Sequence, residues 1–109
     1  MPKFLDDTLI EKLTHLLADG NYTIFNLKGG KRLRTSYCLK VFEGLLKKKS
    51  FIRISRTHLV KKSFIAGTLV RENCYYCKLK NNEEVLISRR RKLKLKVWYP
   101  KLFTKKNTL

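Results

Sequence analysis

Alternating polar and apolar positions predict part of a β-sheet near the start of the chain. Residues 21–28 (NYTIFNLK) alternate between two faces and are rich in β-branched and aromatic side chains, which is typical of a strand. The Gly29-Gly30 pair follows this stretch and favours a hairpin turn. We therefore expect residues 31–36 (KRLRTS) to form the partner strand, with Leu33 facing the core.

The period of the pattern changes in residues 36–48 (SYCLKVFEGLLKK). Leu39, Phe42 and Leu46 are spaced i, i+3 and i+7, which places them on one face of a helix. Ser36 is a candidate N-cap, because a serine hydroxyl accepts a hydrogen bond from the free N–H groups of a first helical turn. We expect a helix here.

Strand patterns return in the second half of the chain. Residues 51–56 (FIRISR) predict a strand, whereas residues 57–65 are compact and apolar enough for a short turn or helix. Further on, the pattern predicts a second hairpin, in which residues 66–70 lead into a strand at 72–80, a polar turn at 81–84 and a strand at 85–88.

Residues 89–98 (RRRKLKLKVW) suit either a short basic helix or a strand. We favour the helix because Ser88, a good N-cap residue, comes directly before it. From Pro100 onward we expect a frayed tail. Strands outnumber helices in this assignment, which indicates an all-β domain and argues against a helix-turn-helix bundle.

The charge of the chain indicates what kind of partner it binds. The chain holds 26 Lys and Arg against 8 Asp and Glu, a formal net charge of +18, with a pI near 10.2. Residues 1–20 are slightly acidic, so the positive charge lies in the rest of the chain. Charge of this size opposes compaction by self-repulsion, and it indicates a polyanionic partner.

Length and cysteine content bound the class of protein. A chain of 109 residues suits one compact domain, which we expect to span residues 1–109. No apolar run is long enough for a membrane span, and the acidic start does not resemble a signal peptide. Three cysteines, an odd number, favour reduced thiols and a cytoplasmic location.

The sequence offers no catalytic or metal-binding constellation. Cys74 and Cys77 form a CxxC spacing, but residues three apart on a strand point to opposite faces and no further ligands complete a zinc site. His15 and His58 have no evident nucleophile beside them. We therefore expect no enzyme activity, no metal and no cofactor, with core packing as the main role of the CxxC cysteines.

Arginines at two places in the chain are better candidates for functional residues. Arg53 lies on one phase of the 51–56 strand, and Arg56 follows the strand where a loop could project it. Arg89, Arg90 and Arg91 are adjacent, so no regular element directs all three the same way. A single arginine is most often solvated surface, but we expect one or two of the 89–91 run to serve a partner.

These motifs together resemble the LytTR family of bacterial DNA-binding domains. The resemblance rests on FIRISRTHLV followed by SFI (residues 51–60 and 63–65), and on SRR at 88–90 after a hairpin. ADGNYTIFNL, GGKRL and LKVFEGLL fit the family's early strand, hairpin and helix. The match covers about residues 10–98 in register, and three motifs in the right order make it specific.

The resemblance implies an all-β fold with one to three short helices that reads double-stranded DNA through loops. By position, the base-reading residues would be Asn21, Tyr22, Arg56 and Arg90. The phosphate-binding residues would be Ser55, Thr57, Arg89, Arg91 and Lys92. Such domains often bind repeated half-sites, so a dimer on DNA is a further expectation, and an upstream signalling protein would be a partner of unknown identity.

The chain departs from the family in two respects. Relatives commonly carry a receiver domain, for which 109 residues leave no room. Only about seventeen residues precede the ADGNYT stretch, where relatives usually have one or two strands. These residues either supply those strands in reduced form or leave a sheet edge open.

Two other functions fit a small basic protein. The first is an RNA-binding or ribosome-associated protein, which would need exposed aromatic rings to stack unpaired bases; Tyr75, Tyr76, Trp98 and Tyr99 are available. The second is an adaptor that binds an acidic protein surface. We favour a sequence-specific transcriptional regulator over both.

Overall fold

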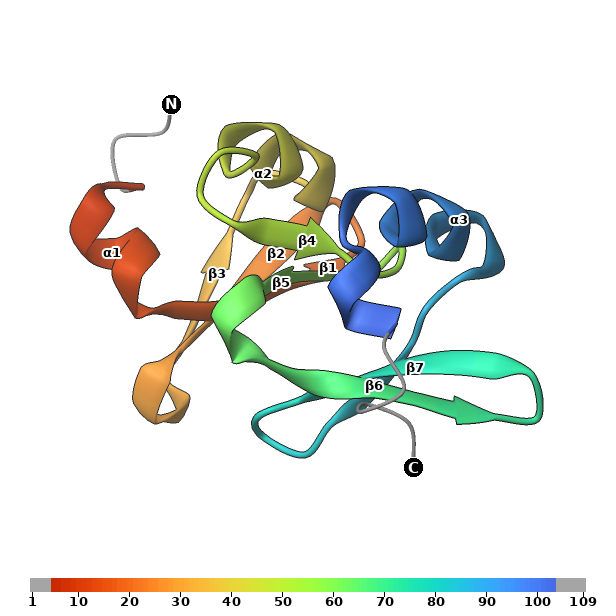
Figure 1. The fold of residues 1–109 in the computed structure, drawn as a ribbon. Coiled ribbons are helices and arrows are strands. Elements are labelled where there is room, and N and C mark those ends of the chain that lie inside the picture. The colour runs from red at the N-terminus through yellow and green to blue at the C-terminus, as the bar shows by residue number, and fades with distance from the viewer. Residues whose placement is uncertain (1–4, 104–109) are drawn as a thin grey trace.

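The computed structural model describes residues 5–103 (Figure 1). It contains eight strands and three short α-helices, with three brief 3-10 turns between and after them. In chain order these are α1 (Asp7–Lys12), β1 (Leu13–Asp19), β2 (Tyr22–Leu27), η1 (Lys28–Gly30), β3 (Arg32–Thr35), α2 (Leu39–Leu45), β4 (Phe51–Arg53), β5 (His58–Lys61), η2 (Lys62–Phe64), β6 (Ile65–Arg71), β7 (Cys74–Leu79), β8 (Glu84–Leu86), α3 (Arg89–Trp98) and η3 (Pro100–Phe103).

The strands form two antiparallel sheets. The larger sheet has the order β3-β2-β1-β5-β4, and the smaller has the order β6-β7-β8. Figure 1 shows α2 over one face of the larger sheet and β6 and β7 beneath the other. The expectation of an all-β fold with short helices is therefore confirmed.

Each face of the larger sheet carries its own hydrophobic core. Phe25, Phe42 and Leu59 belong to the core on the α1 and α2 side, whereas Ile52 and Val60 belong to the core shared with the small sheet and α3. Since neighbouring strand residues point to opposite faces, the side chains of Leu59 and Val60 pack into different cores. Strands β4 and β5 are thus buried from both sides.

The residues before the ADGNYT stretch form an essential strand. Strand β1 lies at the centre of the larger sheet and pairs with both β2 and β5. Helix α1 precedes it, with the Asp6 carboxylate accepting a hydrogen bond from the Leu9 amide at 2.8 Å. The sequence left two alternatives for the short N-terminal segment, strands in reduced form or an open sheet edge. The structure shows the first, because the segment forms a helix and a strand.

Three sequence-based assignments in the first half of the chain were wrong in detail. Residues 57–65 hold strand β5 and then η2, because Leu59 and Val60 pack on opposite faces of a sheet. Helix α2 begins at Leu39 with Cys38 at its N-cap position, so Ser36 does not cap it; the intervening segment is held instead by the Tyr37 carbonyl, which accepts a hydrogen bond from the Thr23 hydroxyl. Leu33 shares a face with Phe25 but is 37% exposed, because β3 is an edge strand.

The C-terminal half also differs from the expected hairpin. The chain turns at Glu72 and Asn73, both with positive φ, so that β6 and β7 form a hairpin before β8 joins as a third strand. The helix expected at residues 89–98 is confirmed as α3. Residues 100–103 form η3, where Phe103 packs edge-on against Tyr75, and the rest of the expected frayed tail lies outside the described residues.

Replacing Phe42 tests the core between α2 and the larger sheet. Its ring is fully buried and makes an edge contact with Phe25, at 4.9 Å between ring centroids. Phe42→Ala should lower the free energy of unfolding by about 3–5 kcal/mol, because it leaves a cavity. The neighbouring Val41 is 40% exposed, so Val41→Ala should change the free energy of unfolding by less than about 0.5 kcal/mol. Equal losses in urea unfolding would contradict this placement of α2.

Candidate nucleic-acid interface

Three loops meet at one end of the larger sheet. They are the β1–β2 turn, the β4–β5 loop at residues 54–57 and the segment between β8 and α3 at residues 87–88. The Ala18 amide donates to the Thr57 carbonyl at 2.9 Å, which joins the first loop to the second. A shallow hollow lined by Ser55, Arg56 and Ser88 joins the second to the third.

The β1–β2 turn presents the first pair of expected base-reading residues. Asp19 pairs with Tyr22, so Gly20 and Asn21 form a two-residue turn, and Gly20 has the positive φ of 60° that this turn requires. Asn21 is exposed at the tip. The Tyr22 ring is covered by the Arg34 guanidinium at 4.3 Å from its centroid. Asn21 is therefore the more accessible of the two.

Arg53 organises the β4–β5 loop from within. Its guanidinium donates to the Ser55 carbonyl at 2.7 Å, to the Arg56 carbonyl at 2.7 Å and to the Glu43 carboxylate of α2 at 2.6 Å. The side chain is only 12% exposed. With the backbone carbonyls on both sides of the loop tip tied to Arg53, the Arg56 side chain is left exposed to solvent.

Hydroxyl groups next to Arg56 bond to one another. The Ser55 and Thr57 side-chain oxygens lie 3.2 Å apart, and the Ser55 oxygen also accepts from the Thr57 amide at 3.2 Å. The Thr57 hydroxyl lies 2.8 Å from Nδ1 of His58. Ser55 is half-buried and Thr57 is exposed, so the loop is ordered by its own polar groups and keeps Thr57 at the surface.

Helix α3 directs the side chains of the arginine run at its start in different directions. The Ser88 hydroxyl accepts a hydrogen bond from the Arg91 amide at 3.3 Å, which confirms the expected N-cap. Arg89 and Arg90 are exposed, and neither forms an ion pair within residues 5–103. Lys92 instead places its ammonium over the Tyr75 ring, at 4.9 Å from the centroid.

Arg91 points toward the protein. Its guanidinium lies 3.8 Å from the Glu43 carboxylate, and its side chain is 28% exposed. Burial, followed by repulsion from Arg53, lowers its pKa. Arg91 lines a groove of about 720 Å³ between α2 and α3, together with Arg53 and Trp98. Of the four expected basic contacts in this run, Arg89 and Arg90 are the outward ones.

Glu83 connects the small sheet to the β4–β5 loop. Its carboxylate lies 3.0 Å from Nε2 of His58 and 3.9 Å from Nε2 of His15. Burial lowers the pKa of His15, with Glu83 opposing that effect. His15 also stacks on Phe64, with 5.3 Å between ring centroids. The two histidines, for which the sequence offered no role, thus lie at the contact between the sheets.

Sequence reasoning missed Arg53, Glu43 and Glu83 as residues that position the loops. For Arg53 a signal existed, because its phase opposite to Ile52 and Ile54 places it on the α2 side of the sheet. Nothing in the pattern joined Glu43 or Glu83 to a loop distant in sequence.

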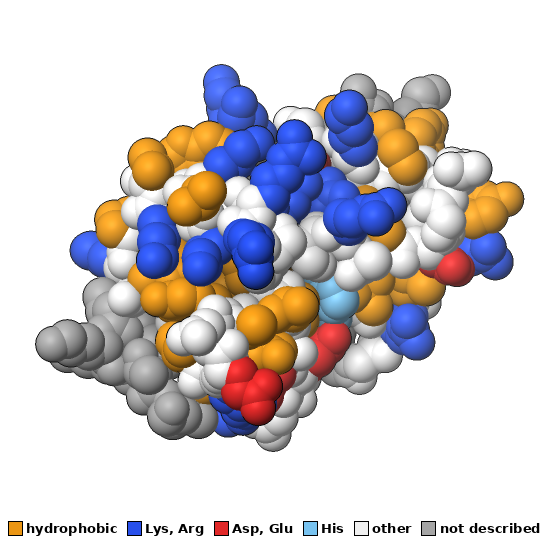
Figure 2. Space-filling view, turned by 90° about the vertical axis from the view of Figure 1, so that its right-hand side faces the viewer, with side chains coloured by type: hydrophobic (Ala, Val, Ile, Leu, Met, Phe, Trp, Pro, Cys, Tyr) orange, Lys and Arg blue, Asp and Glu red, His pale blue; other side chains and the backbone are white. Residues whose placement is uncertain are grey.

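Basic side chains dominate the surface near α3. In the face shown in Figure 2, Lys and Arg side chains gather across the upper half, while the acidic side chains are few and most lie below them. Within residues 5–103, no three His, Cys, Asp or Glu side chains come together as metal ligands. In the same range, no helix has the length and apolar character to cross a membrane.

The CxxC cysteines lie in different surroundings on β7. Cys77 is fully buried and Cys74 is exposed, as expected for residues three apart on a strand. Burial raises the pKa of the Cys77 thiol to about 12, so this thiol stays protonated near neutral pH and acts as a small core residue.

The fold and the basic loop end define a small all-β nucleic-acid-binding domain. Residues 8–99 match the family described as the LytTr DNA-binding domain. Since the match covers most of the chain, the protein belongs to the LytTR family. Its partner is therefore DNA.

A solved structure agrees with this assignment. The chain is similar to the LytTr DNA-binding domain of a putative methyl-accepting/DNA response regulator from Bacillus cereus, with 26% sequence identity and a TM-score of 0.70. The similarity covers 81% of this chain and 81% of the other. None of the curated proteins compared with the chain is similar to it.

Arg53 can be tested against a surface arginine. Arg53→Gln should lower the free energy of unfolding by about 1–3 kcal/mol, since it removes hydrogen bonds of a charged donor from a partly buried site. It should also speed amide exchange at residues 54–57. Arg71 forms an exposed pair with Glu84, and Arg71→Gln should cost much less, because exposed ion pairs contribute little to stability. Unchanged exchange in the loop of the Arg53 variant would refute the positioning role.

The lowered pKa of His15 predicts a pH dependence of stability. The ordinary value is 6.5, and the folded value lies below it. As the pH falls, the unfolded chain therefore binds this proton first. The contribution of neutral His15 is complete above pH 6.5 and is lost as the pH falls toward the folded pKa. His15→Gln should flatten this part of the stability profile measured by urea unfolding. An identical slope in the variant would contradict the assignment.

Proposed function

We propose that the protein is a transcriptional regulator that recognises specific sequences of double-stranded DNA through the three loops at one end of the larger sheet. The observation that carries the proposal is the exposure of Arg56 in the β4–β5 loop and of Arg90 in the first turn of α3, each without an acidic partner in residues 5–103. Two unpaired guanidinium groups, one on an ordered loop and one at the start of a helix, suit the major groove, where arginine binds guanine N7 and O6.

The contacts divide between bases and backbone. Arg56, Arg90 and the Asn21–Tyr22 turn read base edges, with Asn21 the better placed of the pair because Arg34 covers Tyr22. Arg89 and Thr57 lie at the surface beside them and bind phosphates. Ser55, Arg91 and Lys92 are also proposed phosphate contacts, but each already contacts a group of the protein itself and must turn outward.

Lysines elsewhere on the basic surface add affinity without sequence preference. Neutralising phosphates releases condensed counterions, so binding should weaken steeply as salt rises. Binding to repeated half-sites, with two copies on one duplex, is part of the proposal and would appear as two shifted species in a gel titration. A DNA partner also means that the protein acts in the bacterial cytoplasm.

The contacts of the aromatic rings favour duplex DNA over single-stranded RNA. Lys92 and Lys96 lie over the Tyr75 ring at 4.9 and 5.0 Å, and Arg34 lies over Tyr22. Of the four rings named for the RNA-binding alternative, Tyr75, Tyr76 and Tyr99 are half-buried and Trp98 is exposed, and one exposed ring is a poor platform for several unpaired bases. Competition between a selected duplex and a single-stranded RNA of equal length separates the two functions. If the RNA displaced the duplex from the protein, the proposal would be wrong.

Two substitutions on α3 test the division of contacts. Arg90→Ala should relax preference at one position of the DNA site, at a cost of about 1–3 kcal/mol for the preferred base. Lys94 is exposed one turn further along, and Lys94→Ala should weaken all sequences alike and lower the salt slope by about one. Selection from random duplexes, followed by salt titrations, measures both. Equal and uniform losses would show that Arg90 does not read a base.

A further inference from the structure

A second groove lies at the end of the larger sheet away from the reading loops. Its volume is about 560 Å³, which is within the range of small-molecule sites. The start of β1, the end of β2, the β2–β3 turn, η2 and the β7–β8 turn form it. Its lining includes His15, Asn26, Lys28, Lys61, Phe64, Lys80 and Asn81.

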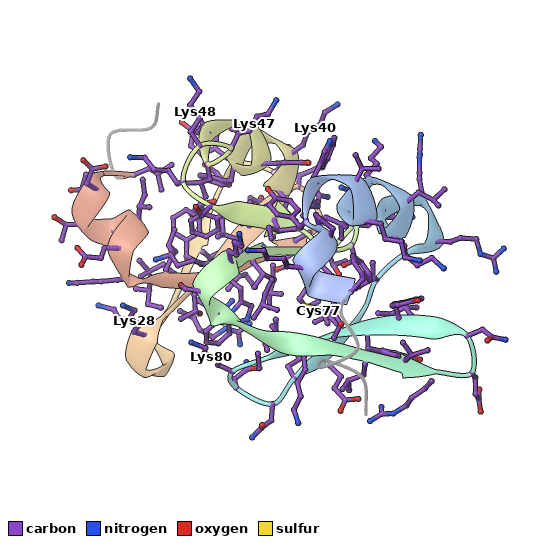
Figure 3. All side chains as sticks on the ribbon, in the orientation of Figure 1. Lys28, Lys40, Lys47, Lys48, Cys77 and Lys80 are labelled. Carbon is purple, nitrogen blue, oxygen red and sulfur yellow. The ribbon has the colours of Figure 1, made fainter. Side chains whose placement is uncertain are left out.

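The groove is electropositive. It contains three lysines and no carboxylate among its lining residues. Figure 3 shows Lys28 and Lys80 beside the β2–β3 turn and the end of the small sheet. Neither forms an ion pair within residues 5–103. Lys61 donates to the Ile10 and Glu11 carbonyls, and burial followed by the charge of Lys28 lowers its pKa.

A buried hydrogen-bond donor in the groove has no partner. The side-chain nitrogen of Asn26 is buried and forms no hydrogen bond with any group in residues 5–103, while the backbone carbonyl of Asn26 accepts one from the Thr14 hydroxyl. Buried donors are almost always paired, so the Asn26 amide remains available to donate to an acceptor that enters the groove. The Phe64 ring, stacked on His15, supplies an apolar wall.

We propose that this groove binds a small organic phosphate. Lys28 and Lys80 bind the phosphate oxygens, the Asn26 amide donates to an oxygen of the ligand, and Phe64 packs against its organic part. A DNA backbone is a poor occupant, because the groove is concave and lies at the Leu27 end of β2, whereas the reading loops lie at the Tyr22 end.

The groove connects with the reading end through Glu83. The Asn81 side-chain oxygen accepts a hydrogen bond from the Glu83 amide at 2.9 Å, and the Glu83 carboxylate contacts His58. His58 in turn contacts Thr57, next to Arg56. A ligand held against Asn81 and His15 therefore changes the β4–β5 loop and the affinity for DNA, a consequence that rests on the proposed function.

Binding is tested first without DNA. Inorganic phosphate and adenosine 5′-monophosphate are titrated at constant ionic strength into the ¹⁵N-labelled protein, with chloride as the reference anion. Saturable shifts are expected at the Asn26 side-chain amide and the Gly29 and Gly30 backbone amides. The Lys28→Ala/Lys80→Ala double variant should bind at least about tenfold more weakly, because it loses two charged donors.

Matched variants make this test specific. Asn26→Asp keeps the side chain's shape but replaces the donor by a carboxylate, and it should abolish binding. Lys48→Ala removes a lysine that Figure 3 shows on the α2 side, away from the groove, and it should bind as the unaltered protein does. Shifts that do not saturate, or equal losses in the Lys48 and Lys28/Lys80 variants, would overturn the site.

The effect on DNA is a separate measurement. Saturating adenosine 5′-monophosphate should change the DNA affinity of the unaltered protein by about fivefold or more and that of the double variant by less. Glu83→Ala should still bind the nucleotide but lose this change. If the nucleotide bound but the DNA affinity did not change, the coupling through Glu83 would be refuted and the binding site would be retained. Failure to bind any duplex would instead contradict the proposed function.

Discussion

The hydrogen bonds of Arg53 are the interaction on which the arrangement of the loops at one end of the larger sheet depends. One guanidinium joins α2, through Glu43, to the backbone of the β4–β5 loop. The planar group presents several donors in a fixed geometry, so three acceptors are held at once. Glu43 also attracts Arg91, which brings the start of α3 to the same place. Elements from three parts of the chain are thereby held in one arrangement.

The few carboxylates of this basic chain are used mainly inside the fold. Glu43 binds Arg53, Glu83 contacts His58, Glu84 pairs with Arg71, and Asp6 caps α1. Each restrains a turn, a loop or a helix end, where a fixed charge has a fixed neighbour. The consequence is that, within residues 5–103, Arg56, Arg89 and Arg90 have no acidic partner that would compete with DNA.

Local patterns predicted elements well and long-range contacts poorly. The alternation at residues 21–28 and the Ser88 cap concern neighbours along the chain, and both were confirmed. The edge position of Leu33 and the strand β5 depend on which strands pair, and no local pattern contains that order. Family resemblance named candidate residues near three loops, but the partners of Arg53 required the fold, because Glu43 lies ten positions away on another element.

The arginine run at the start of α3 violates a local rule of helix stability. The N-terminus of a helix carries partial positive charge and favours acidic residues, yet the first turn of α3 contains arginines and no acid. Ser88 satisfies only one of the free N–H groups with its side chain. An anion at this position would relieve both costs, and phosphates bind readily at helix N-termini. The start of α3 is therefore better suited to binding an anion than to facing water.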